Sequence, residues 1–127
     1  MYGGYIGALQ GSRELYKYDI ASKTWSIVPI PTEKPPALSG FMTCVYKDYL
    51  YIALGFKIQE RKNLDTVWRI NLLSPTSWET LQYRSTGSQL YRSNFGKYFS
   101  GSTLYMIGGY NISGYRNDLN ILNLGIF

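Results

Sequence analysis

Short stretches in which apolar and polar residues alternate recur along the chain, separated by turn-forming residues. Alternation with a period of two is typical of a strand with one buried face, whereas a continuous apolar run such as residues 49–54 predicts a strand covered on both faces. The middle of the chain therefore predicts an antiparallel meander of four strands. We expect these strands at residues 41–46, 49–54, 66–72 and 78–82, the first two joined by a turn at Lys47 and Asp48.

The same pattern occurs three times. A shift of 54 residues places Gly55-Phe56 on Gly109-Tyr110, and a shift of 51 places Gly4-Tyr5 on Gly55-Phe56. Because a twisted four-stranded sheet of this size cannot bury both of its faces alone, the copies must stack face to face, as the blades of a β-propeller do. A shift of 52 gives the third match, at residues 15–20, 67–72 and 119–124.

The expected fold is therefore all-β, with four-stranded antiparallel meander sheets as blades. Residues 1–34 predict a partial blade with the end of a second strand and a third and fourth strand, and residues 35–84 predict a complete blade. Residues 85–127 predict a partial blade with the first three strands. Since propellers usually close with four to eight blades, we expect an incomplete, open fragment. It is either a piece of a longer protein or a wedge that associates with itself.

Composition supports strands. Aromatic residues reach 17%, and the chain holds 13 Tyr and 13 Gly, which suits short strands and tight turns because rings pack well on a pleated surface and glycine permits turn conformations. Charged residues make up only 17%, below the usual value of about 25%. This combination excludes a disordered chain and a coiled coil.

Charge and chemistry narrow the functional classes. The net charge is +5, but the basic residues are scattered, so we expect no nucleic-acid partner. The chain has no histidine, which excludes imidazole-based nucleophile activation and histidine metal sites; we expect neither a metal nor a cofactor. No apolar run is long enough to cross a membrane and no secretory signal is present. With the single cysteine, Cys44, interpreted as a buried thiol, these features predict a cytoplasmic protein without membrane partners.

Several motifs resemble kelch repeats. A hydrophobic strand ends in a double glycine, a Tyr-Asp pair follows about fifteen residues later, and a Trp stands six residues further on. The resemblance extends over essentially the entire chain, although Leu54 replaces one glycine and Asn71 and Asn123 stand where Asp19 does. It implies that large aromatic residues fill the contacts between blades. The structural positions are Gly3, Gly4, Tyr18, Asp19, Trp25, Gly55, Trp68, Trp78, Gly108 and Gly109.

The resemblance also implies that loops between the second and third strands, and between blades, bind partners. The expected function is a non-catalytic protein-interaction module with a partner whose identity the residues do not reveal. Arginine and tyrosine are favoured anchors at such surfaces. The candidate partner-binding residues on these loops are Lys57, Arg61, Lys62, Arg92, Tyr110, Tyr115 and Arg116.

Two alternatives remain open at this point. One is a carbohydrate-active propeller enzyme that uses carboxylates, for which two acids with raised pKa values would have to face one cleft. The other is a purely structural segment of a larger kelch protein. The sequence Asn111-Ile112-Ser113 matches a glycosylation sequon, which we interpret as chance because no secretory signal accompanies it.

Overall fold

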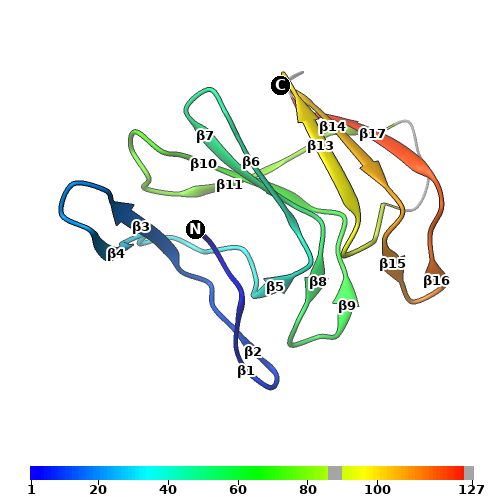
Figure 1. The fold of residues 1–127 in the computed structure, drawn as a ribbon, viewed down its shortest axis with the longest axis horizontal. Coiled ribbons are helices and arrows are strands. Elements are labelled where there is room, and N and C mark those ends of the chain that lie inside the picture. Colours follow the sequence, from blue (N-terminus) through cyan, green and yellow to red (C-terminus); the bar gives the residue numbers. More distant parts are fainter. Residues whose placement is uncertain (86–89, 125–127) are drawn as a thin grey trace.

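A computed structural model describes residues 1–85 and 90–124, and these contain strands, turns and bends but no helix. Figure 1 shows three sheets side by side, with the first sheet at one end, a central sheet, and the third sheet at the other end. The described residues therefore confirm the all-β class and the incomplete propeller. They contain no helix long and apolar enough to cross a membrane.

The central sheet is the meander that the sequence predicts. Its strands are β6 (Met42–Tyr46), β7 (Tyr49–Ala53), β10 (Val67–Asn71) and β11 (Trp78–Leu81), and they lie in the order β11-β10-β7-β6 with antiparallel pairing throughout. In its register, Tyr46 pairs with Tyr49 across the turn, and Val67 pairs with both Ala53 and Leu81.

The third sheet contains a strand that the sequence analysis did not predict. Its order is β12-β17-β14-β13, formed by β12 (Arg84–Ser85), β13 (Gly96–Ser100), β14 (Thr103–Ile107) and β17 (Leu119–Asn123). The short strand β12 precedes the other three in sequence, yet it pairs with the end of β17 in the fourth position of the sheet. It satisfies backbone groups of β17 that would otherwise form an open edge.

The first sheet is smaller, with β3 (Leu15–Asp19) paired to β4 (Thr24–Val28). Tyr2 forms an isolated antiparallel bridge with Leu15, and the amide of Tyr16 donates a hydrogen bond to the Met1 carbonyl over 2.8 Å. The segment around residue 2 thus lies beside β3, where β7 lies beside β10 in the central sheet.

Each sheet carries one small hairpin, and the three hairpins extend toward the same side of the molecule (Figure 1). They are β1 (Tyr5–Gly7) with β2 (Gln10–Gly11), β8 (Phe56–Lys57) with β9 (Lys62–Asn63), and β15 (Tyr110–Asn111) with β16 (Gly114–Tyr115). The same backbone hydrogen bond closes the base of each hairpin, from Ser12 to Gly4, from Leu64 to Gly55, and from Arg116 to Gly109, at 2.8–2.9 Å. Strand β5 (Leu38–Ser39) pairs with β8.

Two hydrophobic clusters join the sheets. Successive residues of β7 point into different clusters, so that Tyr51 and Ala53 contribute to one and Ile52 to the other. This confirms that the apolar run at residues 49–54 is covered on both faces. The cluster between the first and central sheets contains Tyr2, Leu15, Ile30, Leu38, Ile52 and Ile70. The cluster between the central and third sheets contains Met42, Tyr51, Ala53, Leu54, Val67, Leu81, Leu90, Phe95, Leu104, Met106, Leu122 and Leu124.

The large rings expected between blades divide into two groups. Trp68 and Trp78 pack against the first cluster, and the Trp78 ring meets Tyr2 edge to face with centroids 5.3 Å apart. Tyr18 and Trp25 instead contact each other at 5.0 Å on the outer face of the first sheet, where they are exposed. Their location differs from the expectation because no described segment covers that face.

The double glycines are explained by their backbone geometry. Gly55 and Gly109 have φ values of 96° and 94°, and a Cβ at either would lie 2.7 or 2.9 Å from the Cβ of Phe41 or Phe95. Leu54, at the position of the first glycine, still adopts the left-handed conformation with φ of 59°, and its side chain is fully buried. Burial of the leucine side chain offsets the backbone strain there.

The substitution G109A is expected to destabilise the fold more than G4A, by about 1–3 kcal/mol. Both glycines have nearly the same φ, 94° and 96°, but a Cβ at Gly4 meets no atom within 4 Å. The two variants therefore share the backbone strain, and only G109A adds overpacking against Phe95 and the Ser93 carbonyl. Urea denaturation followed by circular dichroism measures the difference; equal losses would contradict this account of the glycine pair.

The first repeat has Asp19 where the second has Asn71, and the turn that follows explains why both residue types occur there. The Oδ1 atom of Asp19 accepts hydrogen bonds from the amide and hydroxyl of Ser22, at 2.7 and 2.8 Å. The Oδ1 atom of Asn71 accepts from the amides of Leu73 and Ser74, at 2.8 and 3.3 Å. Since the turn requires only an acceptor oxygen, either residue type serves.

Candidate partner-binding groove

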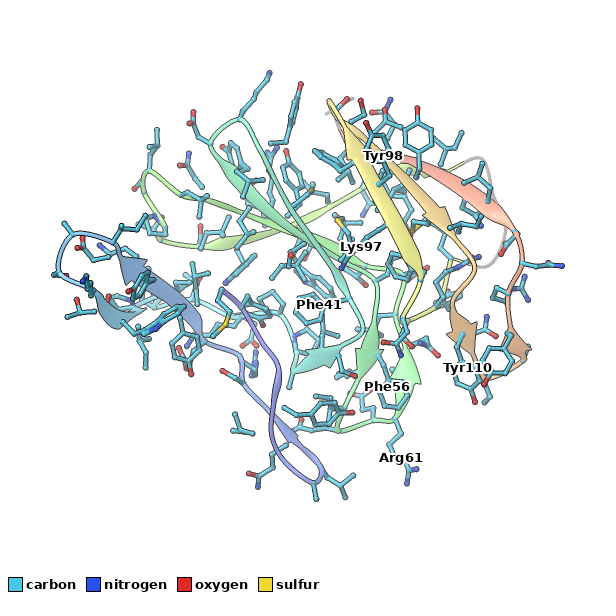
Figure 2. The ribbon with its side chains drawn as sticks, in the orientation of Figure 1. Phe41, Phe56, Arg61, Lys97, Tyr98 and Tyr110 are labelled. Atoms are coloured by element: carbon cyan, nitrogen blue, oxygen red, sulfur yellow. The ribbon has the colours of Figure 1, made fainter. Side chains whose placement is uncertain are left out.

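A hollow of about 620 Å³ lies between the hairpin of the central sheet and the hairpin of the third sheet. We call it the hairpin groove. In Figure 2, Phe56 and Arg61 on the β8–β9 hairpin lie beside Tyr110 on the neighbouring hairpin. The groove is lined by Phe56, Arg61, Lys62, Asn63, Tyr91, Tyr110, Asn111, Ile112 and Ser113.

The first wall is held in place by backbone pairing and one buried side chain. Strand β8 pairs with β5 on one side and β9 on the other, and Ile58, which follows β8, is buried. The amide of Ile58 donates a hydrogen bond to the Ala37 carbonyl at 3.1 Å. Arg61 occupies the turn of this hairpin in a left-handed conformation with φ of 53°. The turn therefore holds a basic side chain at the rim of the groove.

The second wall is attached to the segment that precedes β13. Ser93 and Tyr110 exchange two backbone hydrogen bonds, at 2.9 and 3.0 Å. The buried side chain of Asn111 donates to the Tyr91 carbonyl at 3.0 Å and accepts from the amide of Ser113 at 2.9 Å. The side-chain amide of Asn111, the first residue of the sequon, thus fixes the turn and holds Tyr91 beside the groove.

The groove combines positive charge with exposed apolar surface. Residues 56–63 contain three basic residues and one acidic residue. That acid, Glu60, forms ion pairs with Lys57 and Lys62, which lower its pKa to about 2. Among residues 1–85 and 90–124, no carboxylate forms an ion pair with Arg61. The guanidinium is therefore available to an incoming anionic group.

Rings and an aliphatic side chain form the rest of the lining. Tyr91 and Tyr110 are about half exposed, and Ile112 is 99% exposed. A hydrogen bond with the Asp65 carboxylate raises the pKa of the Tyr91 hydroxyl. Exposed rings beside a cation are typical of surfaces that bind proteins.

The structure brings some of the predicted residues together and separates others. Arg61, Lys62 and Tyr110 line the hairpin groove. Tyr110 also borders a second hollow of about 490 Å³, which Tyr115 and Arg116 line. Lys57 instead lines a hollow with Pro36 and Ala37, separate from both. The sequence analysis did not single out Phe56, Asn63, Tyr91, Asn111, Ile112 and Ser113 as binding residues.

Arg92 lies where a partner cannot reach it. Its side chain has no exposed surface and donates hydrogen bonds to both carboxylate oxygens of Asp118, at 2.8 and 2.9 Å, and to the Gly108 carbonyl at 2.9 Å. Arg92 lowers the pKa of Asp118 well below its usual range. The expected place of Arg92 on the partner surface is therefore corrected, because its guanidinium joins β17 to the end of β14 inside the fold.

Other reactive groups are held in forms that do not favour catalysis. Burial raises the pKa of the Cys44 thiol to about 12, which keeps it protonated. Every carboxyl pKa that departs from its usual value is lowered. The groups that favour the ionised form are Ser22 for Asp19, Arg13 for Glu33, Lys57 for Glu60 and Arg92 for Asp118. Among the described residues, no group of three or more potential ligands could hold a metal ion.

Comparison with known protein families identifies a match over the whole chain. A family model described as the KLHDC2/KLHL20/DRC7 Kelch-repeats domain matches residues 1–127. A search of the curated proteins found no match.

Proposed function

Because the chain belongs to the kelch-repeat family, we propose that it is a protein-interaction module whose partner binds in the hairpin groove. Kelch-repeat domains generally bind proteins and are typically not enzymes. The proposal assigns partner contact to the loops between second and third strands, since these form the hairpins on one side of the molecule (Figure 1).

One observation carries the proposal. Arg61, at the tip of one hairpin, has no carboxylate partner among residues 1–85 and 90–124. It lines the same groove as Tyr110 and Ile112 on the next hairpin. An arginine that already had a carboxylate partner would lose that ion pair on binding, whereas Arg61 gains one. The neighbouring apolar side chains lose contact with water when they are covered, which favours binding.

The chemistry of the lining defines the partner segment. Two short hairpins form the walls of the groove, and an extended peptide segment can lie between them. A carboxylate of that segment would meet Arg61, and an adjacent apolar or aromatic side chain would pack on Phe56 and Tyr110. We therefore propose an acidic peptide segment with an aromatic or aliphatic residue beside the acid.

The test uses a panel of fluorescently labelled short peptides that place Asp or Glu beside Phe or Leu, with Asn or Gln versions as matched controls. Fluorescence polarisation measures their affinity for the chain. We expect the acidic peptides to bind more tightly, and R61A to weaken their binding about tenfold, because a hydrogen bond to a charged group contributes about 1.5 kcal/mol. K23A is the matched control, since Lys23 is also an exposed turn residue with positive φ, at 56°.

The proposal would be overturned if no acidic peptide bound more tightly than its amide version. It would equally be overturned if R61A and K23A weakened binding by the same factor. Raising the salt concentration is expected to weaken binding to the wild type more than to R61A, because salt screens the contact between Arg61 and the acid.

A further inference from the structure

The two ends of the row of sheets present open apolar faces. At one end, the outer face of the β3–β4 sheet exposes Tyr18, Trp25 and Ile27, with Trp25 58% exposed. At the other end, the outer face of the third sheet exposes Tyr98, Ile107 and Leu119, with Tyr98 67% exposed. We call these the first face and the last face; they lie at opposite ends of the molecule in Figure 1.

The last face is equivalent to an interface that already exists in the chain. By the repeat register, Ile107 corresponds to Ala53 and Leu119 to Val67. In the central sheet these positions are fully buried against the third sheet. The last face is therefore the kind of surface on which the next sheet packs.

The first face is equivalent to the other of the two surfaces that meet where neighbouring sheets pack. Tyr18 is equivalent to Ile70 and Trp25 to Trp78, both of which pack on the cluster between the first and central sheets. In the third sheet, the residue equivalent to Ile70 is Leu122, which is buried against the central sheet. The first face is thus equivalent to the surfaces by which the central and third sheets pack on the sheet that precedes each of them. Those surfaces pack on faces that are equivalent to the last face.

At one position, the last face lacks a charge that its buried equivalent carries. The last face has Ile121 where the central sheet has Arg69. Arg69 forms an ion pair with Glu79 at 2.7 Å and lies 4.4 Å from the centre of the Tyr49 ring. At this position the last face is more apolar than its buried equivalent, and exposed apolar surfaces mark sites of association.

We propose that a second copy of this chain docks on these faces, the last face of each copy packing on the first face of the other. Each chain has two four-stranded sheets and one sheet of two paired strands, β3 with β4, so the pair has six of these sheets, which lies within the range of four to eight at which propellers close. The two contacts are equivalent by a twofold axis, so the assembly is a closed dimer. This proposal does not depend on a ligand in the hairpin groove, which lies on a different side.

The test measures the mass of the chain in solution by analytical ultracentrifugation, with one variant for each face. W25D alters the first face and Y98D the last face, and each variant alone is expected to remain monomeric because either change disrupts both contacts of the closed dimer. An equimolar mixture is expected to associate, since one copy supplies an intact last face and the other an intact first face. L9D, an exposed apolar position on the β1–β2 hairpin, is expected to dimerise as the wild type does.

Three results would overturn the proposal. They are a monomeric wild type, a W25D variant that still dimerises by itself, and a mass that keeps rising with concentration, which would indicate open chains instead of a closed pair. Circular dichroism verifies that each variant is folded. If either variant fails to fold, I27D and L119D replace it and give the same comparison on the same two faces. R61A is expected to dimerise normally, which separates this proposal from peptide binding.

Discussion

Replacing Asp118 with alanine is expected to lower the free energy of unfolding by about 3–5 kcal/mol. The Arg92 side chain is fully buried, and Asp118 supplies the carboxylate that both of its terminal nitrogens bind. Removing this carboxylate takes the ion-pair partner in Asp118 away from a buried guanidinium, which costs more than the intact pair contributes. Urea denaturation at neutral pH, followed by circular dichroism, measures the loss.

The central sheet provides the control for this variant. By the repeat register, Leu38 occupies the position of Arg92 and Thr66 that of Asp118. The double variant R92L/D118T copies this apolar solution, and we expect it to recover most of the stability that D118A loses. If D118A were as stable as the wild type, the ion pair would have no structural role.

The same pair predicts how stability depends on pH. Arg92 lowers the pKa of Asp118 in the folded chain, whereas an unfolded aspartate titrates near about 3.9. The folded state therefore binds fewer protons, and the stabilisation is present above this pH and lost as the pH falls toward the folded-state pKa. Between about pH 5 and pH 2 the wild type is expected to lose more stability than R92L/D118T.

Replacing Leu122 with alanine is expected to cost about 2–5 kcal/mol of folding stability. Leu122 is fully buried between the central and third sheets, so truncation removes apolar contacts and leaves a cavity. Leu119 on the same strand is 60% exposed, and L119A is expected to change the stability of the monomer by less than about 0.5 kcal/mol. Thermal and urea unfolding at low protein concentration compare the two variants. Similar losses would contradict the assignment of the two faces.

Much of the fold could be predicted from the sequence because the physical requirements recur at fixed spacing. Alternation, the apolar run at residues 49–54 and the double glycines each specify a local geometry that the structure contains. Strand β12 could not be predicted in this way. It has two residues, and its place is set by the free edge of β17, which is distant in sequence.

The groove was only partly predictable, for a related reason. Residue type and loop position identified Arg61, Lys62 and Tyr110, but not that two particular hairpins form opposite walls. Arg92 was assigned to the partner surface because it lies in a connection between blades and arginine is a favoured anchor. The residue at its equivalent position, Leu38, is buried, which indicates the correct location. Tyr18 and Trp25 were expected in an interface because large rings fill the contacts between kelch blades. Their equivalents, Ile70 and Trp78, do pack in one, whereas the first sheet has no described neighbour on that side.

The common closure of the three hairpins separates recognition from folding. Each base is fixed by one main-chain hydrogen bond to the carbonyl of Gly4, Gly55 or Gly109, and this bond requires no particular side chain in the segment it closes. The enclosed segments already differ in length and composition, while the strands that flank the second and third hairpins keep the same antiparallel pairing, β7 with β10 and β14 with β17. Tip sequences can therefore be exchanged or lengthened at little energetic cost, so that one scaffold can acquire new partners by changing only its exposed ends.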